Sequence, residues 1–187
     1  MLIFSFPEYE EYAGVAVFSG LKIPVENFLQ ELKKAGDIEF QLLNLNLIAG
    51  KEHLYFSILN ALHAFKNKKN FSRSLGIEVL LYASTQKQIR NAIEVMGVKP
   101  EQPVVLIALN SSKDKLEKFF SQASKFFKKE IEDSIVEEWS EEKIQKIKEA
   151  FKISKEEVDA LKVEGVSLPE ILKKLIIERM ALLSTKG

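Results

Sequence analysis

The stretch PVVLIAL, residues 103–109, is the most strand-prone part of the sequence. Its aliphatic and β-branched side chains carry no charge, and a proline is tolerated at the start of a strand. Ser111 and Ser112 follow directly and provide an N-cap for a helix predicted over Lys113–Phe127. The segment therefore predicts a strand that leads into a helix.

Three segments upstream repeat this order of strand and helix. Strands are predicted at residues 15–18, 38–48 and 77–83, where apolar side chains run together. Each is followed by a stretch with helical signals, so helices are predicted at residues 25–35, 51–66 and 86–96. Pro24 and Gly36 frame the first of these helices, and Ser84-Thr85 offers an N-cap for the third, which closes at Gly97.

The character of the chain changes after residue 130. Short charged helices are predicted at residues 141–151 and 155–161, and a final helix at residues 168–183. We therefore expect an α/β (α+β) fold with a small mixed, largely antiparallel sheet flanked by helices. The whole chain, 1–187, is expected to form one domain, in which an α/β core (1–130) carries a packed helical C-terminal section (131–187).

The composition is that of an ordinary globular protein. Apolar residues make up 46% and charged residues 29% of the 187 positions, and the absence of cysteine excludes disulfides and thiolate chemistry. No stretch approaches the roughly 18 apolar residues of a membrane span. The N-terminus lacks the basic region of a signal peptide. These features predict a soluble, cytoplasmic protein with no membrane contact.

Signatures of catalysis are scarce. His53 and His63 are ten residues apart, which is not a metal-ligand spacing on a helix, and each is interpreted as a structural histidine. The glycines are scattered singly, without a phosphate loop or a nucleophile elbow. The acidic residues of the tail alternate with lysines, as on a solvated helix face. We expect no enzyme activity, no metal, no cofactor and no small-molecule substrate.

Positive charge gathers in the middle of the chain. Residues 51–100 contain eight cations but only three anions, although the whole chain is neutral. A nucleic-acid contact is predicted for seven residues, of which six are basic and one is a serine at the predicted helix start: Lys66, Lys68, Lys69, Arg73, Ser84, Lys87 and Arg90. Phe71 or Tyr82 is positioned to stack on an unpaired base.

Two other interpretations of this segment remain open. The lysines are also compatible with an ordinary solvated turn. Alternatively, a helix starting near Ser84–Gln88 would present backbone N–H groups to an anion, which is typical of a small-ligand-binding or enzymatic α/β domain.

The last predicted helix has an unusually wide apolar surface. With each residue turned by ~100° from the last, its apolar side chains cover about half of the helix circumference. A helix that docks only on its own core needs an apolar stripe just ~100° wide. The excess indicates a second contact, with another element of the chain or with a partner. Arg179 lies within the apolar arc and needs a carboxylate, for which Glu78 in its apolar strand is the candidate.

Three blocks of the sequence follow one another along the chain: residues 46–54; RSLGIEVLL at 73–81 followed by Ser84 and QI..AI at 88–93; and IIERMA at 176–181. Together they resemble the TPRKB family, the small non-catalytic kinase-binding subunits of the KEOPS (EKC) complex. The chain departs from many members at Tyr82, Thr85 and Lys87. It is also longer than many members, with an extended N-terminal helix and a helical tail.

The resemblance implies a subunit that does no chemistry itself. It would bind and support the atypical PRPK-type kinase and help to recruit tRNA by its 3′ CCA end, for N6-threonylcarbamoyladenosine formation at position 37. By position, the segment Lys66–Arg90 would meet tRNA. The kinase interface would contain four residues of the last helix: Ile176, Ile177, Met180 and Leu183.

Overall fold

The fold is built on one antiparallel sheet. A computed structural model describes residues 1–33 and 38–183. The strands are β1 (Leu2–Phe6), β2 (Glu11–Phe18), β3 (Glu39–Asn44), β4 (Val104–Asn110) and β5 (Glu130–Ile131). Their order is β1-β2-β4-β3, and β5 pairs with the end of β2 beyond β1. Every pairing among the described strands is antiparallel, so the expected α+β fold with a largely antiparallel sheet is confirmed.

The central strand β4 is buried along its whole length. Because successive side chains of a strand point to opposite faces, Val105, Ile107 and Leu109 enter one apolar cluster. Val104, Leu106 and Ala108 enter a second cluster on the other face. The sheet therefore has two covered faces, which explains why this strand carries no polar alternation.

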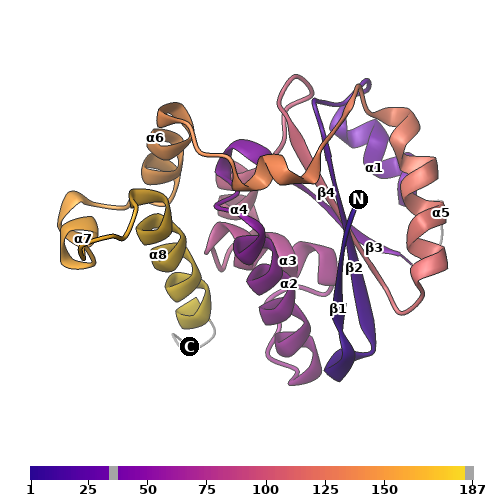
Figure 1. Ribbon diagram of the computed structural model, residues 1–187. Helices are drawn as coiled ribbons and strands as arrows, with labels where there is room; N and C mark the ends of the chain where they lie inside the picture. Colours follow the sequence, from indigo (N-terminus) through magenta and orange to yellow (C-terminus); the bar gives the residue numbers. More distant parts are fainter. Residues whose placement is uncertain (34–37, 184–187) are drawn as a thin grey trace.

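Helices cover both faces of the sheet (Figure 1). On one face lie α1 (Val25–Lys33) and α5 (Lys113–Ala123). The other face carries α2 (Lys51–Lys66), α3 (Leu75–Ser84) and α4 (Ile89–Met96). The C-terminal helices are α6 (Glu141–Ala150), α7 (Lys155–Ala160) and α8 (Leu168–Leu183), and α8 packs on α2 and α3. Short 3₁₀ helices occur at Pro7–Tyr9, Leu45–Leu47, Ser124–Phe126 and Asp133–Glu137.

The predicted strand at residues 77–83 is wrong, because this segment lies inside α3. The Ser74 side chain caps the helix by accepting a hydrogen bond from the Ile77 N–H at 3.3 Å. Helix α3 contacts α2, α4, α8 and the strands β3 and β4, so almost all of its surface is buried. A helix buried all round has no polar face, and its sequence then reads like a buried strand.

Several boundaries also differ from the expectation. Ser84 and Thr85 end α3 rather than cap the next helix, since Thr85 takes the left-handed conformation at φ 55°. Helix α4 begins at Ile89, and Gln88 provides no side-chain cap there. The strand predicted to reach Ile48 ends at Asn44. The predicted helix end near Gly36 lies outside the described residues.

The N-terminal segment forms a hairpin, and the first α-helix of the chain is α1, in the segment where a helix was predicted from Val25. Residues 2–6 form β1, whose Leu2 and Phe6 pair with Val15 and Glu11 of β2. The sequence analysis did not predict this strand. Three consecutive residues of β1, Leu2–Phe4, are partly buried, so the strand shows no clear alternation of buried and exposed side chains. Phe4 and Phe6 pack against Tyr55 of α2.

Candidate functional site

The turn between α2 and α3 presents most of the predicted basic residues. Lys68, Lys69 and Arg73 are exposed, and Lys68 takes the left-handed conformation that turns the chain. Lys66, at the end of α2, donates a hydrogen bond to the Glu8 carbonyl oxygen at 3.0 Å. Its Nζ also lies 5.1 Å from the centroid of the Tyr9 ring. We call Lys66–Arg73 the basic turn.

A buried carboxylate shapes this basic turn. Glu78 of α3 has no exposed surface, and its two oxygens accept hydrogen bonds from the Phe71 N–H at 3.1 Å and the Ser72 N–H at 2.8 Å. Burial raises the pKa of the Glu78 carboxyl, while the two N–H groups oppose that shift. Glu39 of β3 holds the next residues, because it accepts from the Ser74 hydroxyl and the Gly76 N–H.

Phe71 stands at the surface of the basic turn. It is 39% exposed, and the Nζ of Lys87 lies over its ring, 5.5 Å from the centroid. Tyr82 lies behind it, with ring centroids 6.4 Å apart, but is only 1% exposed. Of the two aromatic residues singled out in the sequence, Phe71 alone offers a face that an unpaired base can reach.

The other two predicted contact residues are placed differently from each other. Arg90 is exposed on the first turn of α4. Ser84 is fully buried at the end of α3, where its hydroxyl donates to the Leu81 carbonyl oxygen at 3.1 Å. Of the segment Ser84–Gln88, in which the sequence suggested a helix start for an anion, Ser84 belongs to α3 and only Gln88 directly precedes a helix, α4.

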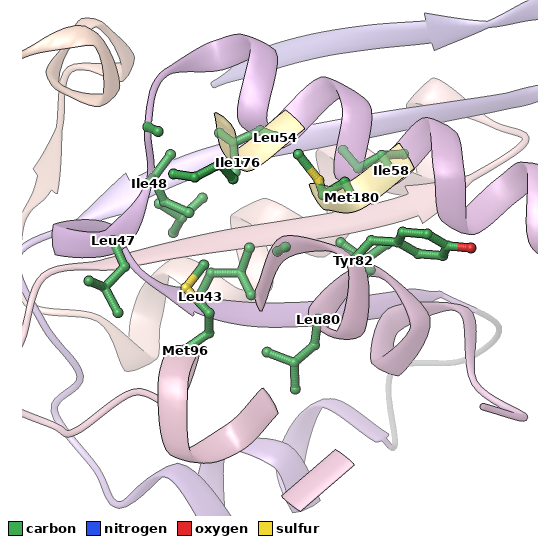
Figure 2. Close-up of a cluster of buried hydrophobic side chains, with 14 of the residues drawn as sticks. Leu43, Leu47, Ile48, Leu54, Ile58, Leu80, Tyr82, Met96, Ile176 and Met180 are labelled. Atoms are coloured by element: carbon green, nitrogen blue, oxygen red, sulfur yellow. The ribbon is translucent and has the colours of Figure 1, made fainter. Parts of the chain in front are cut away.

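Most of the apolar surface of α8 is covered by the chain itself. Ile176 and Met180 have no exposed surface, and Figure 2 shows both beside Leu54 and Ile58 of α2. The Ser57 hydroxyl of α2 donates to the His53 carbonyl oxygen at 2.6 Å, and its oxygen also lies 3.3 Å from the Met180 sulfur. The internal alternative left open by the sequence therefore accounts for these two positions.

The remaining apolar side chains of α8 reach its surface to different extents. Leu183 is 7% exposed, Ile177 is half-buried, and Leu182 is 40% exposed. Among the residues predicted for the kinase interface, Ile177 is thus the one that a partner can contact most readily. Leu182 is not among the four residues predicted for the kinase interface, but its exposure makes it a second candidate contact residue.

Arg179 connects α8 to α7 and to the end of α6. It forms an ion pair with Glu157 of α7, with Nη2 and Oε1 2.5 Å apart, and it donates a hydrogen bond to the Phe151 carbonyl oxygen. The pairing of Arg179 with Glu78 that the sequence suggested is wrong, because Glu78 binds the backbone of the basic turn instead.

The basic segment and α8 meet at one hollow in the surface. The hollow has a volume of about 270 Å³ and is lined by Thr85, Lys87, Arg179, Leu182 and Leu183. Lys87 belongs to the predicted RNA surface and Leu183 to the predicted kinase interface. The two surfaces are therefore neighbours, although the residues that carry them are far apart in sequence.

The two histidines differ in environment. His53 is fully buried, and its ring nitrogens lie 3.0 Å from the Ala49 N–H nitrogen and 2.9 Å from the Ala83 carbonyl oxygen. His63 is exposed beside the Tyr9 hydroxyl and the Asn67 amide. Within residues 1–33 and 38–183, no group of three or more potential metal-ligand side chains is assembled. Over the same residues, no helix combines the length and apolar character that crossing a membrane requires.

The fold places the chain in the α+β class, and the comparisons give the family. A model described as "Kinase binding protein CGI-121" matches residues 24–184, so the chain belongs to the CGI-121 family. A curated relative, the regulatory protein Cgi121 of Methanocaldococcus jannaschii, is 35% identical over 116 residues. That match covers 62% of this chain and 72% of the relative. The family resemblance drawn from the sequence is confirmed.

Proposed function

We propose that this chain is the non-catalytic, kinase-binding subunit of a cytoplasmic KEOPS-type complex. It binds and supports the PRPK-type kinase and helps to recruit tRNA by the 3′ CCA end. The recruited tRNA then receives N6-threonylcarbamoyladenosine at position 37. Membership of a kinase-binding family supports the first half of the proposal. The observation that carries the second half is the exposed Phe71 ring within the basic turn.

The basic turn offers the two kinds of contact that single-stranded RNA uses. An unpaired base that replaces the Lys87 ammonium over the Phe71 ring would stack on that ring. The displaced ammonium is then free to bind a neighbouring phosphate. Lys68, Lys69 and Arg73 supply further cations along the path of the backbone.

The backbone of the basic turn is already fixed, so little of its conformational freedom would be lost when RNA binds. Glu78 and Glu39 hold the backbone of residues 71–76 through the hydrogen bonds described above. A preformed loop loses less conformational entropy when a ligand binds, so fewer contacts suffice.

On the kinase side, the exposed end of α8 is the proposed contact. Ile177 and Leu182 present apolar surface there, and Ala181 is exposed beside them. Ile176, Met180 and Leu183 support this surface from below by fixing α8 on α2 and α3. The proposed kinase interface thus combines two residues that touch the partner with three that hold the helix.

The RNA half is tested by measuring tRNA affinity of two variants. Reversal of Lys68, Lys69 and Arg73 to Glu is expected to weaken binding at least tenfold near physiological salt, because three phosphate contacts are lost. Phe71→Ala is expected to lose on the order of 1–3 kcal/mol of tRNA-binding free energy, which is the contribution of one stacked base.

Matched variants keep the RNA test specific. Charge reversal at the exposed residues Lys155, Lys162 and Lys174 controls for net charge, and Ile93→Ala controls for loss of an exposed apolar side chain, since Ile93 is 53% exposed. Unchanged tRNA affinity in both the triple variant and Phe71→Ala would refute the RNA half.

The kinase half is tested by co-purification. Ile177→Glu places a charge on the proposed interface but not in the core, since Ile177 is half-buried. We expect the kinase to be lost from the purified complex while the circular dichroism and melting of the isolated chain remain close to those of the wild type. Lys162→Glu, at an exposed position outside α8, is expected to retain the kinase. Retention of the kinase by Ile177→Glu would exclude this face.

A further inference from the structure

A second group of lysines lies at the corner where three chain segments meet. The segments are Gly20–Lys22, Lys99–Gln102 and the stretch after α5, residues 125–129. They contribute five exposed lysines, which we call the lysine corner: Lys22, Lys99, Lys125, Lys128 and Lys129.

Backbone hydrogen bonds tie the three segments together. The Lys22 N–H donates to the Phe126 carbonyl oxygen at 2.8 Å, and the Lys128 N–H donates to the Gly20 carbonyl oxygen at 2.9 Å. The Leu21 N–H donates to the Pro100 carbonyl oxygen at 2.9 Å. The lysine side chains are flexible, but the places from which they start are fixed relative to one another.

The positive charge of the lysine corner is largely uncompensated. Lys128 forms an ion pair with Glu101, with Nζ and Oε2 2.6 Å apart, but Glu101 is itself exposed. Lys22 Nζ donates to the Lys125 carbonyl oxygen at 3.2 Å, which is a neutral acceptor. Within the described residues, no ion pair involves Lys22, Lys99, Lys125 or Lys129. Like charges held together in this way destabilise the free protein slightly and favour an anionic partner.

The lysine corner lies at the opposite end of the sheet from the basic turn. It adjoins the end of the β2–β4 ladder at which Phe18 pairs with Val104. At the other end of β4, Leu109 pairs with Glu39, which accepts the hydrogen bond from Ser74 beside the basic turn. Five residues of strand separate these ends by roughly 17 Å. The two basic surfaces therefore cannot bind the same few nucleotides.

The chemistry of the lysine corner fits a nucleic-acid backbone better than a protein surface. None of the large exposed apolar side chains lies on its three segments. A protein interface is usually centred on apolar or aromatic anchors, whereas a phosphate backbone is bound through cations alone. Lysines act as point charges, so they suit phosphates without reading a base.

We propose that the lysine corner binds the phosphate backbone of a helical part of the tRNA, while the basic turn holds the single-stranded 3′ end. The inference rests on the proposed tRNA-binding function. It adds a second contact, which would fix the direction in which the tRNA leaves the protein. It predicts that whole tRNA binds more tightly than its 3′ end by itself.

The test compares two RNA ligands and two charge-reversed variants. The ligands are whole tRNA and a short single-stranded oligonucleotide that ends in CCA. The test variant reverses Lys22, Lys125 and Lys129 to Glu, and the control variant reverses Lys155, Lys162 and Lys174. We expect the test variant to bind tRNA on the order of tenfold more weakly, and the slope of log affinity against log salt to fall by about 2–3. Its affinity for the oligonucleotide is expected to equal that of the wild type.

Each other outcome overturns a definite part of the argument. If the wild-type chain binds neither RNA, the proposed tRNA function and the lysine-corner inference both fail. If the wild type binds both RNAs and the test variant binds tRNA as tightly as the control variant, only the inference fails. The inference also fails if the test variant keeps its tRNA affinity but loses binding to phosphatidylserine vesicles, because the corner would then serve a membrane surface.

Discussion

The Nε2 atom of His53 donates a hydrogen bond to the carbonyl oxygen of Ala83 at 2.9 Å, which joins the first turn of α2 to the end of α3. The tautomer follows from the other ring nitrogen. Nδ1 lies 3.0 Å from the backbone nitrogen of Ala49, which can only donate, so Nδ1 accepts and the proton is on Nε2. A neutral imidazole therefore satisfies two backbone groups in the core.

We predict that acid weakens the fold through this histidine. Burial lowers the pKa of His53 from 6.5 to about 4, and the nearby Lys143 charge acts in the same direction. Because the pKa is lower in the folded state, the stabilisation is complete above pH 6.5 and is lost as the pH falls toward 4. Between about pH 7.5 and about pH 5, the loss is about 2 kcal/mol. Urea unfolding at the two pH values measures it.

The exposed His63 provides the control for this effect. His53→Gln should be less stable at neutral pH, but its stability should change less than that of the wild type between the two pH values. His63→Gln should follow the wild type. Equal pH dependence in the wild type and His53→Gln would show that another group carries the acid sensitivity.

A second prediction concerns the carboxylate that shapes the basic turn. Glu78→Ala leaves the N–H groups of Phe71 and Ser72 without their acceptor, and each lost buried partner costs about 1–3 kcal/mol. Hydrogen exchange at these two amides should accelerate beyond the change in global stability. Glu94→Ala, an exposed carboxylate on α4, should leave both amides protected. Slow exchange at both amides in Glu78→Ala would mean that the conformation of the turn does not depend on the Glu78 carboxylate.

The sequence was most informative where an element has one exposed face. The helix predicted at residues 51–66 and the last helix predicted at 168–183 match α2 and α8 in both bounds. Helix α3 could not be recognised from periodicity, because neighbours surround it on all sides. Ser74 was the missed local signal, since it stands three residues before Ile77 and caps the helix.

The candidate surfaces were only partly predictable for a related reason. The charge count located the basic turn, because solvated lysines stay at the surface whatever the fold. It could not separate Phe71 from Tyr82, or show that Ser84 is buried. Those distinctions depend on how α3 packs, and that packing is decided by residues distant in sequence. The lysine corner could not be predicted from the sequence for the same reason, because hydrogen bonds between three distant segments of backbone bring its lysines together.

The ion pair between Arg179 and Glu157 gives a third prediction. The two side chains are 28% and 38% exposed, so solvent screens their interaction. In a double-mutant cycle of Arg179→Met and Glu157→Gln, we expect a coupling free energy of about 0.5–1 kcal/mol. Thermal melts of the four proteins measure it. A coupling free energy near zero would indicate that the hydrogen bond from Arg179 to the Phe151 carbonyl is what links α8 to the preceding helices.

Truncation of the neighbouring residues Ile176 and Ile177 on α8 should affect folding and kinase binding to different extents. Ile176 has no exposed surface and packs beside Leu54, so Ile176→Ala should cost about 2–5 kcal/mol of folding free energy. Ile177 is half-buried, and Ile177→Ala should cost less than about 1.5 kcal/mol. For kinase binding we expect the opposite ranking, because Ile177 lies in the proposed interface. At a temperature where both variants are folded, Ile177→Ala should reduce the affinity for the kinase more than Ile176→Ala does, as measured by calorimetric titration. If Ile176→Ala weakened kinase binding more while remaining folded, α8 would have to leave the core to meet its partner.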